Sequence, residues 1–138
     1  MKPYSILDNL IFLRIETTGN DGENHKILGI SAVKIKNKLV TKFNTLVNPN
    51  TLMPLSIFVL GRNITQEDLA ISPQLNEVMK ELLVFFGDLP LVSLNGTFDE
   101  ISLEVSNVFL DLLELFAILF PELTEFNHQY LFNKFIPN

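Results

Sequence analysis

The chain has 138 residues, contains no cysteine, and carries 10 basic against 16 acidic side chains, a formal net charge of −6. This length suits one domain with a core of its own. The lack of cysteine excludes disulfides, zinc–thiolate sites and thiol nucleophiles. The acidic balance argues against a protein that coats nucleic acid by neutralising phosphates.

Apolar residues make up 47% of the chain and include twelve phenylalanines. Such a surplus predicts that a protein partner or a second copy covers some apolar surface. The longest uncharged stretch, residues 43–61, is interrupted by Pro49 and Pro54 and does not predict a membrane helix. The N-terminus lacks the apolar core of a signal peptide. We therefore expect a soluble, cytoplasmic protein that makes no use of a membrane.

The first part of the chain predicts three consecutive strands. Residues 10–15 form a short run rich in β-branched and aromatic side chains, which is typical of a buried strand. Residues 27–35 and 39–47 predict two more strands, joined by a tight turn at Asn37 and Lys38. Three lysines project from this hairpin, and we interpret them as protection of a sheet edge, with phosphate binding as the alternative: Lys34, Lys36 and Lys38.

A long connection punctuated by prolines leads to the first predicted helix. Ser72 is placed to cap this helix, Pro73 suits its first position, and Gly87 ends it. Apolar residues at helical spacing predict the face that packs on the core: Leu75, Val78, Met79, Leu82, Leu83 and Phe86.

The remaining chain predicts alternating strands and helices. Strands are expected at 89–94 and 108–110, and helices at 98–107, 111–120 and from Thr124 to about residue 135. The helix over 111–120 is apolar on nearly every side except Glu114, so it is either deeply buried or partly an interface. This order of elements predicts an α/β fold with a mixed sheet.

Three carboxylates stand at strand ends or helix starts, namely Glu16, Asp99 and Asp111. In α/β sheets such positions line the crevice that binds ligands. Converging carboxylates can hold Mg²⁺, and two such ions can activate a water against a phosphodiester. Taken singly, each acid is better explained as a helix cap or a solvated group.

Two segments resemble the first and second motifs of the DEDD-type 3′–5′ exonucleases: Ile15-Glu16-Thr17-Thr18-Gly19 and Asn95-Gly96-Thr97-Phe98-Asp99. Within that family they are most similar to the proofreading subunit of bacterial DNA polymerase III and to exonuclease domains fused to some helicases. The resemblance spans about residues 8–135 and implies a single exonuclease-like domain over 1–138. The implied fold is ribonuclease-H-like, with a mixed central sheet of about five strands, the first three antiparallel, flanked by helices.

The resemblance also implies the site residues. Glu16 and Asp99 would be the catalytic residues and the ligands of any metal ion. The implied substrate-binding residues are Arg14, Thr17, Thr18, Asn95 and Phe98.

The first motif departs from the family's Asp-x-Glu pattern, because Arg14 replaces the first acid. A period of two places Arg14 and Glu16 on one face of the strand. Two unit charges about 4 Å apart interact by about 4 kcal/mol at an effective dielectric near 20, so a guanidinium between Glu16 and Asp99 would neutralise them without a metal ion. The alternative is an arginine that points outward beside an eroded metal site.

Other family features are missing. Leu94 stands where relatives often carry histidine, and the segment from Asp99 to Asp111 is short. The third motif, which supplies a general-base histidine and a last aspartate, is not found: no acid follows His128. We therefore expect a divergent domain that is truncated at its C-terminus relative to the family and lacks part of the catalytic machinery.

Two functions from different classes remain open. The first is a catalytically impaired exonuclease-like domain, a pseudoenzyme without cofactor, that acts as a binding or scaffolding module in DNA replication or repair. It would have a protein partner or self-associate, and it would bind single-stranded DNA weakly. The alternative is an active 3′–5′ exonuclease on DNA that uses Mg²⁺ or Mn²⁺, with Arg14 on the scissile phosphate. A cleft that holds a nucleotide or small anion through Arg14 is a third possibility.

Overall fold

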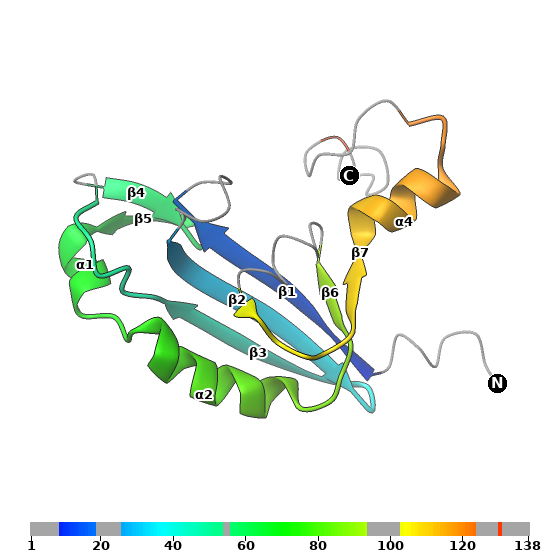
Figure 1. The fold of residues 1–138 in the computed structure, drawn as a ribbon, viewed down its shortest axis with the longest axis horizontal. Coiled ribbons are helices and arrows are strands. Elements are labelled where there is room, and N and C mark those ends of the chain that lie inside the picture. Colours follow the sequence, from blue (N-terminus) through cyan, green and yellow to red (C-terminus); the bar gives the residue numbers. More distant parts are fainter. Residues whose placement is uncertain (1–8, 19–25, 54–55, 94–102, 124–129, 131–138) are drawn as a thin grey trace.

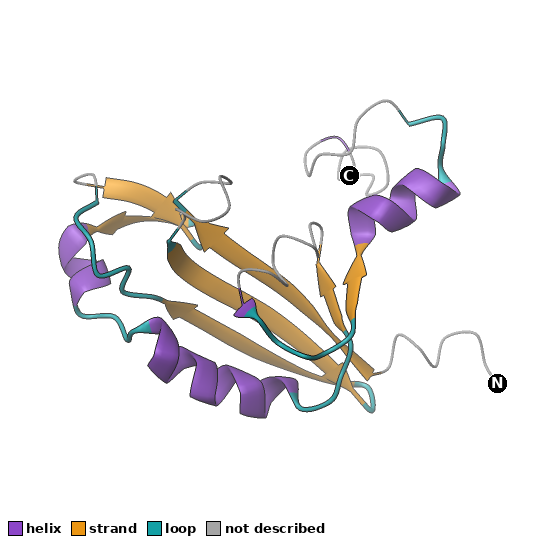
Figure 2. Ribbon diagram, viewed as in Figure 1, coloured by secondary structure: helices purple, strands orange, loops and turns teal. Residues whose placement is uncertain are grey.

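The structure is a computed structural model that describes residues 9–18, 26–53, 56–93, 103–123 and 130. These residues form a five-stranded sheet in the order β3-β2-β1-β6-β7, a separate two-stranded sheet and three helices (Figures 1 and 2). The elements of the large sheet are β1 (Asn9–Thr17), β2 (Ile27–Lys36), β3 (Leu39–Leu46), β6 (Leu91–Ser93) and β7 (Phe109–Asp111). The others are β4 (Ser56–Val59), β5 (Arg62–Thr65), α1 (Gln66–Ala70), α2 (Leu75–Phe86) and α4 (Leu112–Leu119).

The large sheet is mixed. β2 runs antiparallel to both β1 and β3, whereas β6 runs parallel to β1 and β7 runs parallel to β6. Asn37 and Lys38 connect β2 to β3 with φ values of 51° and 67°, the left-handed pair that matches the twist of a two-residue hairpin. The expected α/β class, the five-stranded mixed sheet and the antiparallel order of its first three strands are confirmed.

The main core lies between one face of the sheet and α2, which runs alongside β3 in Figure 1. The side chains that β1 and α2 bury in this core recur every two residues in the strand and every four in the helix: Ile11, Leu13, Ile15, Val78, Leu82 and Phe86. Of the apolar stripe predicted for α2, Leu83 is the exception, because it is 51% exposed. Gly87 ends the helix at a φ of 51°, as predicted.

Helix α2 begins at Leu75, two residues later than predicted. Ser72 does not cap it, because its hydroxyl donates to the carbonyl of Asp68 at 2.6 Å and closes the end of α1. The first turn of α2 is held instead by the carboxylate of Glu77, which accepts the backbone N–H of Gln74 at 3.0 Å.

The predicted long connection before α2 contains a hairpin that the sequence analysis missed. β4 and β5 are joined by Leu60 and Gly61, with φ values of 51° and 77°. The hairpin and α1 bury a second, smaller apolar cluster against β2: Leu28, Val59, Ile64 and Leu69. The four-residue strands and the neighbouring prolines hide this unit from a reading of periodicity.

Lys34 does not protect a sheet edge. Its Nζ donates to the carbonyl of Phe85 at 2.7 Å and lies 4.3 Å from the centroid of the Phe85 ring. It therefore joins β2 to the C-terminal end of α2, where a cation is favourable. Lys36 and Lys38 are exposed, as predicted for protecting side chains.

The C-terminal elements are only partly described. Residues 98–102 of the helix predicted over 98–107, and all but Tyr130 of the helix predicted from Thr124, lie outside the described residues. Leu103 and Tyr130 are helical, whereas residues 105–107 are not. α4 follows β7 directly, and three of its apolar side chains are exposed: Leu115, Ile118 and Leu119. These three side chains are therefore not deeply buried, which was one of the two expectations for this helix. None of the described helices has the length and apolar character needed to cross a bilayer.

Candidate functional site

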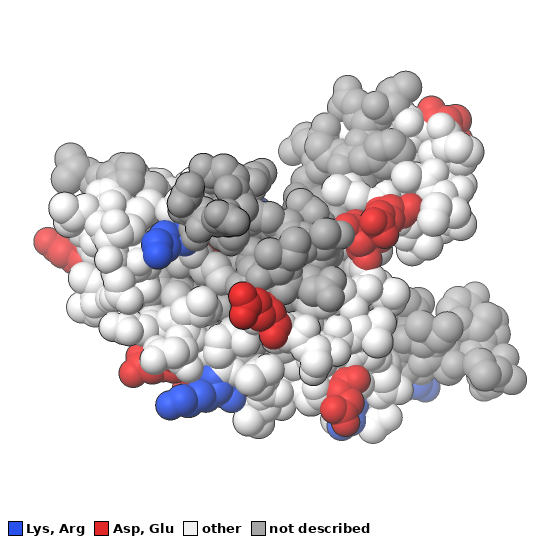
Figure 3. Space-filling view, viewed as in Figure 1, with Lys and Arg blue, Asp and Glu red and all other residues white. Residues whose placement is uncertain are grey.

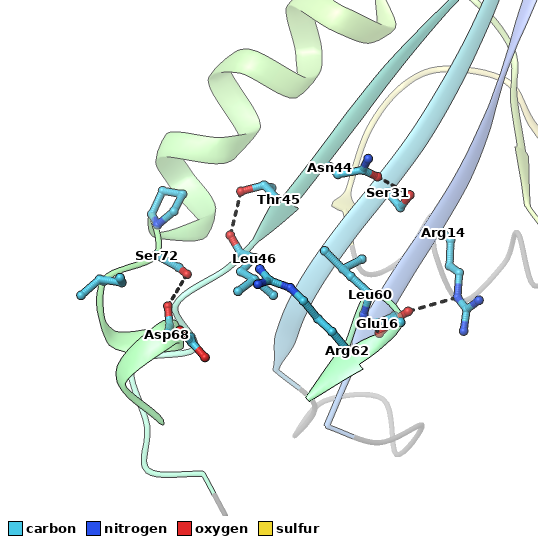
Figure 4. Close-up of a pocket in the computed structure, with 13 residues that line it drawn as sticks. Arg14, Glu16, Ser31, Asn44, Thr45, Leu46, Leu60, Arg62, Asp68 and Ser72 are labelled. Carbon is cyan, nitrogen blue, oxygen red and sulfur yellow. Dashed lines mark hydrogen bonds and ion pairs between the residues drawn. The ribbon is translucent and has the colours of Figure 1, made fainter. Parts of the chain in front are cut away.

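Glu16 and Arg14 project from the same face of β1, opposite the face that packs on α2. Arg14 Nε lies 3.4 Å from Glu16 Oε1 (Figure 4). The side chain of Arg14 is 63% exposed, whereas that of Glu16 is 18% exposed. This ion pair between Arg14 and Glu16 lies at the surface and not in the interior.

The second oxygen of Glu16 is also engaged. Oε2 accepts the backbone N–H of Leu60, in the turn of the β4–β5 hairpin, at 2.8 Å. Figure 4 shows Glu16 between Leu60 and Arg14. The carboxylate therefore meets a guanidinium on one side and a main-chain donor on the other.

Thr17 and Thr18 follow Glu16 at the end of β1, where the pairing with β2 shifts register. Thr18 exchanges two hydrogen bonds with Lys26: its N–H donates to the Lys26 carbonyl at 2.9 Å, and its hydroxyl accepts the Lys26 N–H at 3.0 Å. Thr18 thus joins the ends of β1 and β2. Its predicted contact with substrate is untested.

A cleft of about 730 Å³ opens beside Glu16, between the sheet and the unit formed by the hairpin and α1. Its charged lining residues are balanced in sign: Arg14, Arg62, Glu16 and Asp68. Ser31 and Asn44 line the cleft as well, and their side chains hydrogen-bond at 2.6 Å. The cleft therefore offers polar groups without a strong net charge.

The carboxylate of Asp68, which lines the cleft, accepts two hydrogen bonds from Thr65. The backbone N–H of Thr65 donates to Asp68 Oδ2 at 2.9 Å and the Thr65 hydroxyl donates to it at 3.0 Å. These two bonds, with a smaller contribution from the charge of Arg62, hold the pKa of Asp68 below its ordinary value. Because Asp68 closes the capping box of α1, its lowered pKa has a structural cause.

Of the two predicted metal ligands, only Glu16 lies among the described residues. A divalent cation needs several oxygen ligands, and both oxygens of Glu16 already have donors. Asp111 caps α4, since its Oδ1 accepts the N–H groups of Leu113 at 2.8 Å and Glu114 at 3.3 Å. Over residues 9–18, 26–53, 56–93, 103–123 and 130, no group of three metal-ligating side chains comes together.

Several predicted site residues cannot be placed. Asp99, Asn95 and Phe98 lie outside the described residues, as do His25 and His128. A guanidinium shared between Glu16 and Asp99 is therefore untested.

The part of the site that the β4–β5 hairpin contributes was not predicted from the sequence. The main chain of Leu60 and the side chain of Arg62 reach the cleft from a segment expected to be a plain connection. The signal was present in the short apolar run over 56–59 followed by a glycine at position 61.

Comparison with known proteins gives one family and a consistent set of relatives. A family model described as an exonuclease of the RNase_T type matches residues 11–131. The PolC-type DNA polymerase III of Clostridium perfringens is 32% identical over 126 residues, which cover 84% of this chain and 9% of that protein. The same enzyme of Caldanaerobacter subterraneus is 35% identical over 133 residues, covering 88% of this chain and 9% of that protein. The PolC-type DNA polymerase III of Bacillus subtilis is 29% identical over 140 residues, which cover 93% of this chain and 10% of that protein. The chain thus spans about a tenth of the length of these relatives.

Proposed function

We propose that the chain is an exonuclease domain with impaired catalysis. It belongs to the exonuclease family whose model matches residues 11–131, and it is related to PolC-type DNA polymerase III. In this proposal the ribonuclease-H-like fold is kept and works as a binding or scaffolding module in a DNA replication context. The same proposal includes a role in DNA repair and a cytoplasmic location.

One observation carries the proposal: Arg14 pairs with Glu16 at 3.4 Å. By the motif resemblance, Arg14 stands where the family has its first metal-binding acid. Arginine stays protonated at any physiological pH, so it cannot stop repelling a cation by losing a proton. Phosphodiester hydrolysis of this type depends on the metal ion and on the water that it activates. A permanent positive charge beside Glu16 therefore supports impaired catalysis.

Charge and surface support weak binding of nucleic acid and contact with protein. The chain is acidic overall, and the described basic side chains on the face in Figure 3 are scattered. A patchy and partly acidic surface supplies little of the electrostatic affinity that single-stranded DNA needs. The exposed apolar residues of α4 support a protein partner or self-association. Sedimentation at increasing concentration tests self-association.

The alternative is an active metal-dependent 3′–5′ exonuclease, and the position of the cleft at the end of β1 favours it. The two proposals are separated by incubating the chain with 3′-labelled single-stranded DNA and Mn²⁺. We expect no more release of mononucleotides than from the Glu16→Gln variant. Glu81→Gln, which changes an exposed carboxylate on α2, is the control for loss of charge alone. Release that Glu81→Gln retains and Glu16→Gln loses would establish the active enzyme and refute impairment.

A further inference from the structure

We infer that Glu16 acts in this chain as the anchor of the β4–β5 hairpin, holding the Leu60-Gly61 turn on the sheet with a carboxylate that Arg14 neutralises. The inference rests on the contacts of Glu16 and Gly29 and does not require that hydrolysis is lost. It assigns a positioning role to a residue that the family uses as a metal ligand.

The contacts of Glu16 are those of a structural carboxylate. Leu60 N–H donates to Oε2 at 2.8 Å across 44 residues of sequence, and Arg14 Nε lies 3.4 Å from Oε1. With 18% of its side chain exposed, Glu16 has lost most of its hydration and depends on such donors. One oxygen accepts the Leu60 N–H, and the other is paired with the Arg14 guanidinium.

The packing around Glu16 brings the hairpin close to the sheet. Gly29 pairs directly with Glu16 in the register of β1 and β2. A Cβ at Gly29 would lie 2.8 Å from Val59 Cγ1 and 3.1 Å from Leu60 Cγ, which is too close for an ordinary contact. The missing side chain at Gly29 therefore admits the hairpin, and the carboxylate of Glu16 holds it by its turn.

The turn itself benefits from an anchor. Leu60 has a φ of 51°, a left-handed conformation that residues with a Cβ adopt at a cost. The hydrogen bond to Glu16 fixes the direction of the Leu60 N–H in that conformation. The next residues, Gly61 and Arg62, line the cleft, so the anchor also sets the position of one cleft wall.

Hydrogen exchange of the Leu60 amide on the whole chain tests the anchor directly. Glu16→Ala removes the acceptor, and we expect the Leu60 amide to exchange about tenfold faster or more, as the loss of a hydrogen bond to a charged group implies. Glu16→Gln keeps an acceptor oxygen and should restore most of the protection. Glu81→Ala removes an exposed carboxylate from α2 and should leave Leu60 unchanged. Unaltered protection of Leu60 in Glu16→Ala would overturn the inference.

A second measurement uses the unmodified chain and so does not depend on whether a variant folds. With millimolar Mn²⁺ added, the exchange of the Leu60 amide should stay the same, because Glu16 remains on the hairpin. Faster exchange of Leu60 with Mn²⁺ would mean that the cation draws Glu16 away, and the inference would be wrong. Failure here is distinct from failure of the proposed function, which is decided by release of mononucleotides.

Discussion

Arg14 and Glu16 are two residues apart on β1, and their charges decide what this end of the strand can do. In the family pattern both positions are acidic, and two neighbouring carboxylates repel one another until a cation joins them. Here one is a guanidinium 3.4 Å from the other's oxygen, so the pair is satisfied on its own. Under our proposal, these positions neutralise each other and do not capture a cation.

Arg14→Asp should restore part of the affinity for a cation without restoring hydrolysis. The variant places two carboxylates on one face of β1, and Mn²⁺ would then relieve their repulsion. We expect Mn²⁺ to raise the melting temperature of Arg14→Asp and not that of the original chain. The DNA should remain intact, because the sequence offers no third motif. Hydrolysis by this single variant would contradict our interpretation of the C-terminal part.

Arg14→Ala should cost little stability, contrary to what an internal ion pair would require. With 63% of its side chain exposed, Arg14 is well screened by water, and such pairs contribute about 0–1 kcal/mol. Urea unfolding of Arg14→Ala should therefore resemble that of Lys42→Ala, an exposed cation on β3. A much larger loss for Arg14→Ala would indicate that the guanidinium holds further buried acids.

At the scale of elements, charged side chains bind the ends of helices. Lys34 links β2 to the last turn of α2, and Asp68 closes the first turn of α1. The first contact joins two distant elements, and the second closes a local helix cap. Each should make a measurable contribution to the stability of the fold.

Lys34→Met should lower the free energy of unfolding by about 1–2 kcal/mol, because it removes a hydrogen bond and a contact with the Phe85 ring at a helix end. Methionine keeps much of the apolar stem, so the loss reports on the ammonium group. Urea unfolding measures it, with Lys42→Met as the exposed control. Equal stability of the two variants would show that Lys34 is a solvated edge residue after all.

Asp68→Asn should remove a pH-dependent part of the stability. Since the folded pKa of Asp68 is lowered from 3.8, its contribution is complete above pH 3.8 and disappears as the pH falls through the folded pKa. The difference in melting temperature between the original chain and Asp68→Asn should stay constant from neutral pH to about pH 4 and shrink below it. A difference that grows on acidification would contradict the assigned direction.

The elements that periodicity reveals were predictable, and those set by distant contacts were not. The strands β1, β2 and β3 and the turn at Asn37 and Lys38 follow from local sequence, and the sequence predicts them correctly. The β4–β5 hairpin has strands of four residues, and its buried side chains pack on Leu28, which lies about 30 residues earlier in the chain, and on Leu69 of the helix that follows. The start of α2 was misplaced because Ser72 uses its hydroxyl on the preceding helix.

The same division holds for the site. A period of two predicts that Arg14 and Glu16 meet, and they do. Nothing local predicts the bond from Leu60 to Glu16 across 44 residues, or the exposure of Arg14. Both depend on where the hairpin docks, which only the assembled fold determines.

On the scale of the whole molecule, the fold of an exonuclease domain is combined with a cleft whose described charges balance. The family model covers most of the chain, whereas its relatives are about ten times longer. Our proposal of a binding or scaffolding domain would use this sheet for its shape and its contacts.

The central claim, that a guanidinium has replaced the metal ion beside Glu16, is tested most directly by titrating the unmodified chain with Mn²⁺ in a calorimeter. We predict no saturable heat in the micromolar range, because Arg14 repels the cation and both oxygens of Glu16 have donors. Saturable micromolar binding that Glu16→Gln abolishes would contradict the account.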